Sequence, residues 1–102
     1  MKDTFDYLKE LLRLKVSPHA IMLYVVLIDL YKKSIENNLK DENGFFVILT
    51  ITEIQNLLNC SRPTAINILR ELEEKHYIIK NFDNGRPTKI YFVENEYLKA
   101  MT

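Results

Sequence analysis

In the first part of the chain, apolar residues recur at steps of three and four positions. These residues are Phe5, Leu8, Leu11, Leu12 and Val16. This spacing places them on one face of a helix, with polar and charged residues on the other faces. We therefore predict a short amphipathic helix over residues 4–15.

A longer helix is predicted immediately after this segment, from Pro18 to about Glu36. Ser17 and Pro18 are typical of a helix start, because the hydroxyl caps the first turn and proline there sacrifices no hydrogen bond. Residues 20–31 are apolar at eleven of twelve positions. A membrane-spanning helix needs about 20 such residues, and Asp29 interrupts this run. We expect a helix that is covered on more than one side, and no membrane partner.

A strand and a short helix are predicted after a polar connection. Residues 45–49 form an aromatic and β-branched run, which is typical of a strand. Thr50 follows it, and Glu53 three positions later completes a capping box, so a helix is expected to begin there and to end near Asn59. Residues 37–44 are predicted to form the polar connection and a turn.

Ser61 is predicted to cap the next helix, with Arg62 and Pro63 in its first turn, where proline is tolerated. The residues expected to face the core are Ala65, Ile66, Leu69, Leu72 and His76. Those expected on the opposite side are Thr64, Asn67, Arg70, Glu71 and Glu74. A turn that contains Cys60 separates this helix from the preceding one, so the pair is predicted to form a helix-turn-helix.

Two β-type runs, residues 77–82 and 89–93, follow this pair of helices. The sequence Asn84-Gly85 between them is a strong hairpin signal. A strand before a helix-turn-helix and a hairpin after it together predict a winged helix.

The predicted fold class is mostly α with a small β-sheet, a single winged helix-turn-helix DNA-binding domain over residues 1–102. It has an extra N-terminal helix over residues 1–16, a winged-helix core over residues 17–93 and a tail over residues 94–102. In such a domain the second helix of the pair fits the major groove, and its N-terminal residues meet the edges of the bases.

Charge is distributed unevenly along the chain, although its sum is zero. The 102 residues include 14 Lys and Arg and 14 Asp and Glu, so a nucleic-acid surface must come from local segregation of charge. Residues 61–93 hold six basic and four acidic residues, a net of +2, whereas residues 1–60 hold seven basic and eight acidic residues, a net of −1. The positive excess thus falls on the predicted reading helix and hairpin.

Four strings of the sequence resemble the N-terminal domain of plasmid replication initiator protein A. They are DENG at 41–44, LNCSRPTAI at 58–66, LRELEE at 69–74 and GRPTKIY at 85–91. The resemblance covers roughly residues 17–93 and implies a winged-helix domain that dimerises on repeated sites in a plasmid origin. Family members approach the first long helix through an extended, proline-containing segment, whereas residues 4–16 are predicted here to be helical. Initiators of this type also carry a second, host-directed domain, so a stand-alone regulator built from the same module stays an alternative.

Eight residues are candidates for contact with double-stranded DNA. Those on the reading helix are Arg62, Pro63, Thr64, Asn67 and Arg70, and those on the hairpin are Lys80, Arg86 and Lys89. Arginine pairs with guanine and asparagine with adenine in the major groove, whereas cations on a hairpin suit phosphates. The alternative is a solvated helix face on which Arg70 pairs with Glu73 or Glu74.

A homodimer is predicted, because a helix that is apolar on all sides must be covered on all sides. The candidate interface residues are Phe5, Leu8, Leu12, Tyr24, Leu27 and Tyr31. The alternative is coverage of the long helix by the N-terminal helix of the same subunit. Two-fold symmetry would match repeated or palindromic DNA sites.

No arrangement of residues in the sequence indicates an enzyme, a metal site, a cofactor or a small-molecule ligand. Cys60 is expected to be a structural thiol, and His19 and His76 have no metal-ligand company in the sequence. Residues 41–43 lack the spacing of a calcium loop and predict a solvated turn. One cysteine and no signal peptide fit the cytoplasm.

The predicted function is therefore sequence-specific binding of double-stranded DNA, as the origin-binding domain of a plasmid replication initiator. A winged-helix transcriptional regulator and a protein interaction or dimerisation module are the alternatives.

Overall fold

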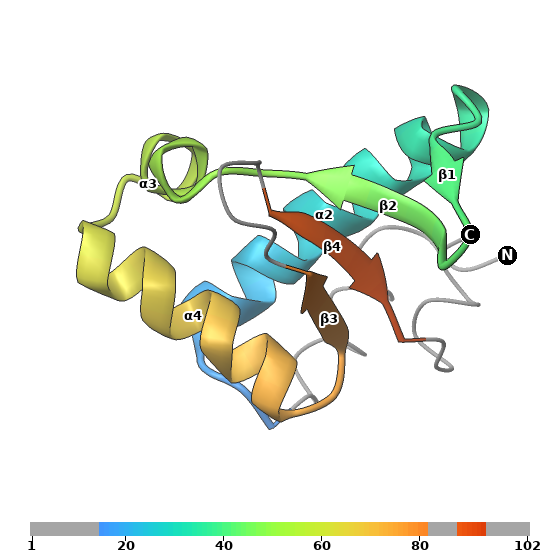
Figure 1. Ribbon diagram of the computed structural model, residues 1–102. Helices are drawn as coiled ribbons and strands as arrows, with labels where there is room; N and C mark the ends of the chain where they lie inside the picture. The colour runs from blue at the N-terminus through green and yellow to red at the C-terminus, as the bar shows by residue number, and fades with distance from the viewer. Residues whose placement is uncertain (1–14, 82–87, 94–102) are drawn as a thin grey trace, which may run out of the picture.

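The computed structural model describes residues 15–81 and 88–93 (Figure 1). The helices of this part are α2 (Pro18–Glu36), α3 (Ile51–Leu58) and α4 (Arg62–Glu74). Its strands are β1 (Lys40–Asp41), β2 (Gly44–Ile48), β3 (Ile78–Asn81) and β4 (Lys89–Phe92). The order of these elements is that of a winged helix, as predicted. Residues 4–14 of the predicted N-terminal helix and the tail over residues 94–102 lie outside the described residues, and Lys15 lies in a bend.

The helices of this part begin where the sequence predicts, because each is capped by a hydroxyl. Ser17 Oγ accepts a hydrogen bond from the Ala20 N–H at 3.3 Å. At α3, Thr50 Oγ1 accepts from the Glu53 N–H at 3.1 Å, and Glu53 Oε1 accepts from the Thr50 N–H at 3.2 Å. Ser61 caps α4 in the same way. Each cap satisfies an N–H group that has no partner within its helix, which fixes the start of that helix.

The same helices are each followed by a residue in the left-handed region. These residues are Asn38, Asn59 and His76, with φ angles of 54°, 51° and 64°. The prediction that His76 faces the core is wrong, since its side chain is exposed. The His76 N–H donates to the Glu73 carbonyl at 3.0 Å, and the next N–H, of Tyr77, donates to the Leu72 carbonyl at 3.0 Å. This Schellman motif turns the chain before His76 can extend the apolar face of α4.

The strands form one antiparallel sheet in the order β1-β2-β4-β3. Strands β3 and β4 form the predicted hairpin, with Ile78 opposite Phe92. β2 comes from the middle of the chain and pairs with β4, so that Val47 lies opposite Ile90. β1 was not predicted, because its two polar residues carry no strand pattern, and it pairs with β2 across a tight turn.

One core lies between the helices and the sheet, because α2 packs on the sheet and α4 and α3 pack beside α2 (Figure 1). The largest side chains without significant exposure are Tyr24, Leu23, Leu27, Ile54, Leu72, Ile78 and Ile90. The ring of Tyr24 lies 5.7 Å from that of Tyr77 and 5.8 Å from that of Phe92. The buried Ser34 hydroxyl donates to the Phe46 carbonyl at 2.7 Å and so joins α2 to β2.

Two residues predicted for a dimer interface belong to this core. Tyr24 and Leu27 have no exposed surface, so the prediction that they contact a second subunit is wrong. An apolar pattern does not say which sides of a helix its own chain covers. Here the rings of Tyr77 and Phe92 lie against Tyr24, and Leu27 belongs to the same core cluster. Tyr31 is half-buried, with its ring 4.6 Å from that of Phe92. The other candidates, Phe5, Leu8 and Leu12, lie outside the described residues.

The core does not enclose α2 completely. Met22 and Val25 are 51% and 43% exposed. The helix therefore leaves apolar side chains in contact with solvent. Within the described ranges, no helix combines the length and the apolar character needed to cross a lipid bilayer.

Candidate nucleic-acid interface

Residues 59–61 join α3 to α4 and fix the angle between them. Asn59 takes the left-handed conformation that ends α3, and the Cys60 N–H donates to the Gln55 carbonyl at 3.1 Å. Cys60 itself is half-buried and packs against the core, in agreement with a structural thiol. Ser61 then caps α4, so every residue of the three-residue turn has a structural role. The predicted helix-turn-helix is thereby confirmed.

Helix α4 has one face in the core and one face in solvent. Its buried residues are Ala65, Ile68, Leu69 and Leu72. Its exposed residues are Arg62, Pro63, Asn67, Arg70 and Glu74. Pro63, Asn67 and Arg70 are four and three positions apart, so they form one strip along the helix. Arg62 lies at the N-terminal end of this strip, where a recognition helix meets base edges.

The buried face of α4 is wider than the sequence predicts. Ile66 is half-buried, and Ile68, which the predicted core face omits, is buried. Glu71, predicted to face solvent, is half-buried, and its carboxylate accepts from the N–H and the hydroxyl of Ser17, both at 2.7 Å. The reason is that α4 packs against both α3 and α2, so residues on two sides of the helix have contacts.

The two arginines of the exposed face have no acidic partner in the part of the chain that the structure describes. Among the described residues, the ion pairs are Lys33–Asp29, Lys80–Glu73 and Lys89–Asp41. Arg62 and Arg70 take part in none of these pairs, so the alternative in which Glu73 or Glu74 neutralises Arg70 is not found. Both guanidinium groups are therefore available to an anion or a base edge from outside.

Thr64 is the least available of the predicted helix contacts. It is half-buried, and its Oγ1 accepts from the Ser61 hydroxyl at 2.9 Å. Its N–H also donates to Ser61 Oγ. The side chain thus completes the cap of α4. A DNA contact of the Thr64 hydroxyl would have to form in addition to its hydrogen bond with Ser61.

The two described lysines of the hairpin both contact carboxylates of their own subunit. Lys80 Nζ lies 3.6 Å from Glu73 Oε1, and the Lys80 N–H donates to Glu73 Oε2 at 3.0 Å. Lys89 Nζ lies 3.0 Å from Asp41 Oδ2 and 4.4 Å from the centre of the Phe46 ring. Neither lysine is a free cation, so the sequence overstates the positive charge of the hairpin. Arg86 lies outside the described residues.

Asp41 is the centre of a hydrogen-bond network that the sequence does not reveal. Its Oδ2 accepts from the Tyr91 hydroxyl at 2.6 Å as well as from Lys89, and its Oδ1 accepts from the Asn43 N–H at 2.8 Å. The Tyr91 hydroxyl first, and Lys89 next, hold the pKa of Asp41 down at about 2. The same hydrogen bond raises the pKa of Tyr91. The prediction of a solvated turn at residues 41–43 is therefore wrong for Asp41, whose side-chain partners Lys89 and Tyr91 are 48 and 50 positions away.

No three His, Cys, Asp or Glu side chains of the described ranges come together in the manner of a metal site. Two features characterise the surface described above: the packing of one face of α4 in the core, and the polar and basic side chains on its exposed face. They define a winged-helix domain whose second helix of the helix-turn-helix exposes Arg62, Asn67 and Arg70. The chain belongs to the family of replication initiator protein A (RepA) N-terminal domains, because the model of that family matches residues 8–101. The match confirms the family suggested by the four sequence strings.

Solved structures of similar shape carry related descriptions. One, the "N-Terminal domain of DNA binding protein", has a TM-score of 0.66 and 21% identity, and the alignment covers 84% of this chain and 70% of that one. A "Structure of MDR initiator" has a TM-score of 0.63 and 27% identity, over 84% of this chain and 71% of that one. A "Structure of Rep-DNA complex" has a TM-score of 0.65 and 21% identity, over 83% and 69%. No curated protein sequence matches the chain significantly.

Proposed function

We propose that this domain is the origin-binding part of a replication initiator and that it binds double-stranded DNA sequence-specifically through α4. The observation that carries the proposal is the exposed strip with its two unpaired arginines, on a helix whose other face is anchored in the core. Family membership supports it, and so does the similar structure described as a Rep-DNA complex.

The mode of binding follows from the chemistry of the strip. The N-terminal half of α4 enters the major groove, where Arg62 suits guanine O6 and N7 and Asn67 suits adenine N6 and N7. Arg70, two turns along α4, is placed for the phosphate backbone at the edge of the groove. Lys80 and Lys89 remain with their carboxylates, so they contribute little to phosphate binding. Arg86 remains a predicted phosphate contact of the hairpin.

A single domain of zero net charge holds DNA weakly at physiological salt, since phosphate contacts supply most of the non-specific affinity. We therefore expect it to bind repeated or palindromic sites as a homodimer, in the cytoplasm. In such a complex the two recognition helices lie about 34–36 Å apart when one helical turn separates the half-sites. Sedimentation at increasing protein concentration, with and without a two-site duplex, tests the stoichiometry.

The test of base readout uses Asn67→Ala on a duplex that the unmodified chain selects from a random library. We expect the variant to lose about 1–3 kcal/mol of specific binding and to relax the preference at one base position. Asn43→Ala is the matched control, because Asn43 is also exposed but lies in the β1–β2 turn, at the opposite end of the molecule from α4 (Figure 1). Equal affinity of Asn67→Ala and the unmodified chain would reject this face, and failure to select any duplex would reject the function.

A further inference from the structure

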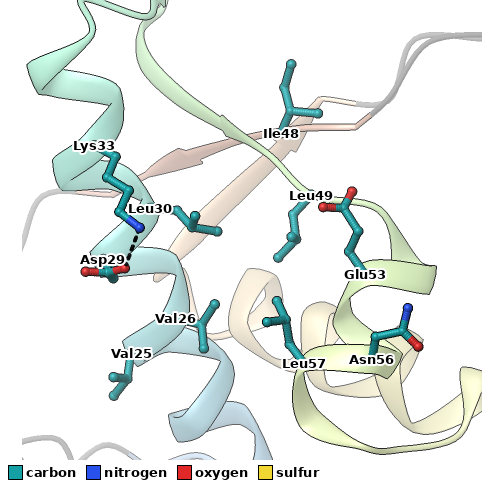
Figure 2. A pocket seen from close by; sticks show the side chains of 10 residues that line it. All are labelled: Val25, Val26, Asp29, Leu30, Lys33, Ile48, Leu49, Glu53, Asn56 and Leu57. Atoms are coloured by element: carbon teal, nitrogen blue, oxygen red, sulfur yellow. Dashed lines mark ion pairs between the residues drawn. The ribbon is translucent and has the colours of Figure 1, made fainter.

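A groove of about 670 Å³ runs between α2 and α3, and DNA binding through α4 does not use it. Its apolar lining comes from Val25, Val26 and Leu30 of α2, Ile48 and Leu49 at the end of β2, and Leu57 of α3. Figure 2 shows the side chains of Leu30, Leu49 and Leu57 pointing toward the space between the two helices. The groove thus has an apolar floor framed by two helices.

Several apolar side chains that line this groove are exposed to solvent. Leu57 is 54% exposed, Ile48 44% and Val25 43%. Met22, one turn before Val25 on α2, is 51% exposed and extends the apolar strip along the helix. Contiguous exposed apolar side chains are costly in water and are typical of a surface that another segment covers.

The edges of the groove carry acidic groups. Asp29 stands on the α2 side, where Lys33 lies 3.4 Å from it, and Glu53 stands on the α3 side (Figure 2). Lys33 neutralises one of these two carboxylates in part, since both partners of that pair are more than 60% exposed. An occupant that matches this groove has an apolar face with basic residues beside it.

The N-terminal segment of this chain has that chemistry. Phe5, Leu8 and Leu12 share one face of a helix, and Lys9 and Arg13 directly follow two of them. The apolar face matches the groove. Lys9 and Arg13 are four positions apart, so they lie together on one side of that face and match one of the two acidic edges.

The segment also has the required length and starting point. The described chain begins at Lys15, Val16 packs against the core, and Ser17 is held at the start of α2 by Glu71. A helix over residues 4–14 is about 16 Å long, and the stretch of α2 from Met22 to Lys33 is about 18 Å long. A reversal of the chain at residues 15–17 therefore suffices to lay this helix antiparallel to α2.

We propose that residues 4–14 dock as a helix in the groove between α2 and α3 of their own subunit. The docked helix covers Met22, Val25 and Leu57 and joins the long helix to the first helix of the helix-turn-helix. It completes the coverage of α2 that the described residues leave open. Phe5, Leu8 and Leu12 then belong to their own subunit, so the homodimer proposed above would form through other residues. A second copy that inserts its own N-terminal segment is the competing occupant.

Disulfide trapping decides between these occupants. The natural thiol is removed by Cys60→Ser, and Leu8→Cys is combined with Leu57→Cys in the full-length chain. Under a mild oxidant at low protein concentration, we expect an intramolecular disulfide, seen as a monomer that has lost two hydrogens by intact mass. Leu8→Cys with Ile79→Cys is the matched control, because Ile79 is 55% exposed on β3, outside the groove. A covalent dimer that increases with protein concentration would overturn docking within the subunit, and equal trapping in both pairs would overturn the groove as its place.

Hydrogen exchange gives a readout that does not depend on engineered cysteines. We expect the amides of residues 7–13 to be protected in the unmodified chain and to exchange at least ten-fold faster in Leu57→Lys, which places a charge in the groove. Because Leu57 is exposed, this variant is expected to fold. Ile79→Lys introduces the same charge outside the groove and is expected to leave these amides unchanged. Exchange of residues 7–13 at unstructured rates in the unmodified chain would overturn the proposal.

Discussion

The unpaired and the paired cations of the proposed interface are expected to affect the salt dependence of DNA affinity differently. Arg70 is exposed without an acidic partner, whereas Lys80 lies against Glu73. Each phosphate that a protein neutralises adds about 0.9 to the slope of log affinity against log salt. Over a fourfold rise in salt, from about 50 to 200 mM, one such contact corresponds to a loss of about 3.5-fold in affinity. We expect Arg70→Ala to reduce the slope by about 0.9.

Lys80→Ala is expected to leave the slope almost unchanged. The Lys80 ammonium lies 3.6 Å from Glu73, and that side chain also accepts the backbone N–H of Lys80, which holds the carboxylate in place. A phosphate contact would have to break this pair, so few counterions are released by it. The converse variant is Asp41→Asn, which releases Lys89 from its carboxylate and is expected to steepen the slope by up to about 0.9.

The assay is fluorescence anisotropy with a labelled duplex over a salt series, with thermal unfolding of every variant to confirm the fold. Asp29→Asn serves as a control for net charge, because it removes an acidic group from α2 at a distance from α4. A reduced slope in Lys80→Ala equal to that in Arg70→Ala would refute the reasoning that intramolecular pairing withholds the hairpin lysines. If Asp29→Asn steepened the slope as much as Asp41→Asn, the effect of Asp41→Asn would be due to the change in net charge and not to the release of Lys89.

Three further predictions concern stability. Ser34→Ala is expected to lower the free energy of unfolding by about 1–3 kcal/mol in chemical denaturation, because it leaves the Phe46 carbonyl without a buried donor. His76→Gly is expected to raise that free energy by about 0.5–1 kcal/mol, since glycine relieves the cost of a left-handed φ but is more flexible when unfolded. The depressed pKa of Asp41 gives stability that is fully present above about pH 4 and is lost as pH falls toward 2. The unfolding temperature of Asp41→Asn should therefore fall less than that of the unmodified chain over this range, and parallel curves would contradict the role of Asp41.

Much of the fold is determined by short-range chemistry in the sequence. Ser17, Thr50 and Ser61 each cap a helix through an N–H three positions away, so the start of each helix can be read from neighbouring residues. The hairpin likewise follows from two β-type runs and a turn signal. The exposure of Asn67 and Arg70 follows from helical periodicity and from the apolar residues between them. Winged-helix architecture and family membership could thus be predicted before the structure.

Only the tertiary structure decided which charges and which apolar residues are available. Glu71 meets Ser17 over 54 positions, and Asp41 meets Lys89 and Tyr91 over 48 and 50. No local pattern encodes such contacts, because they exist only after β2 has paired with β4 and α4 has packed on α2. For the same reason an apolar helix could not show that Tyr24 lies in the core while Val25 faces a groove. Periodicity assigns residues to the faces of one helix, and only packing against the rest of the chain determines which faces are covered.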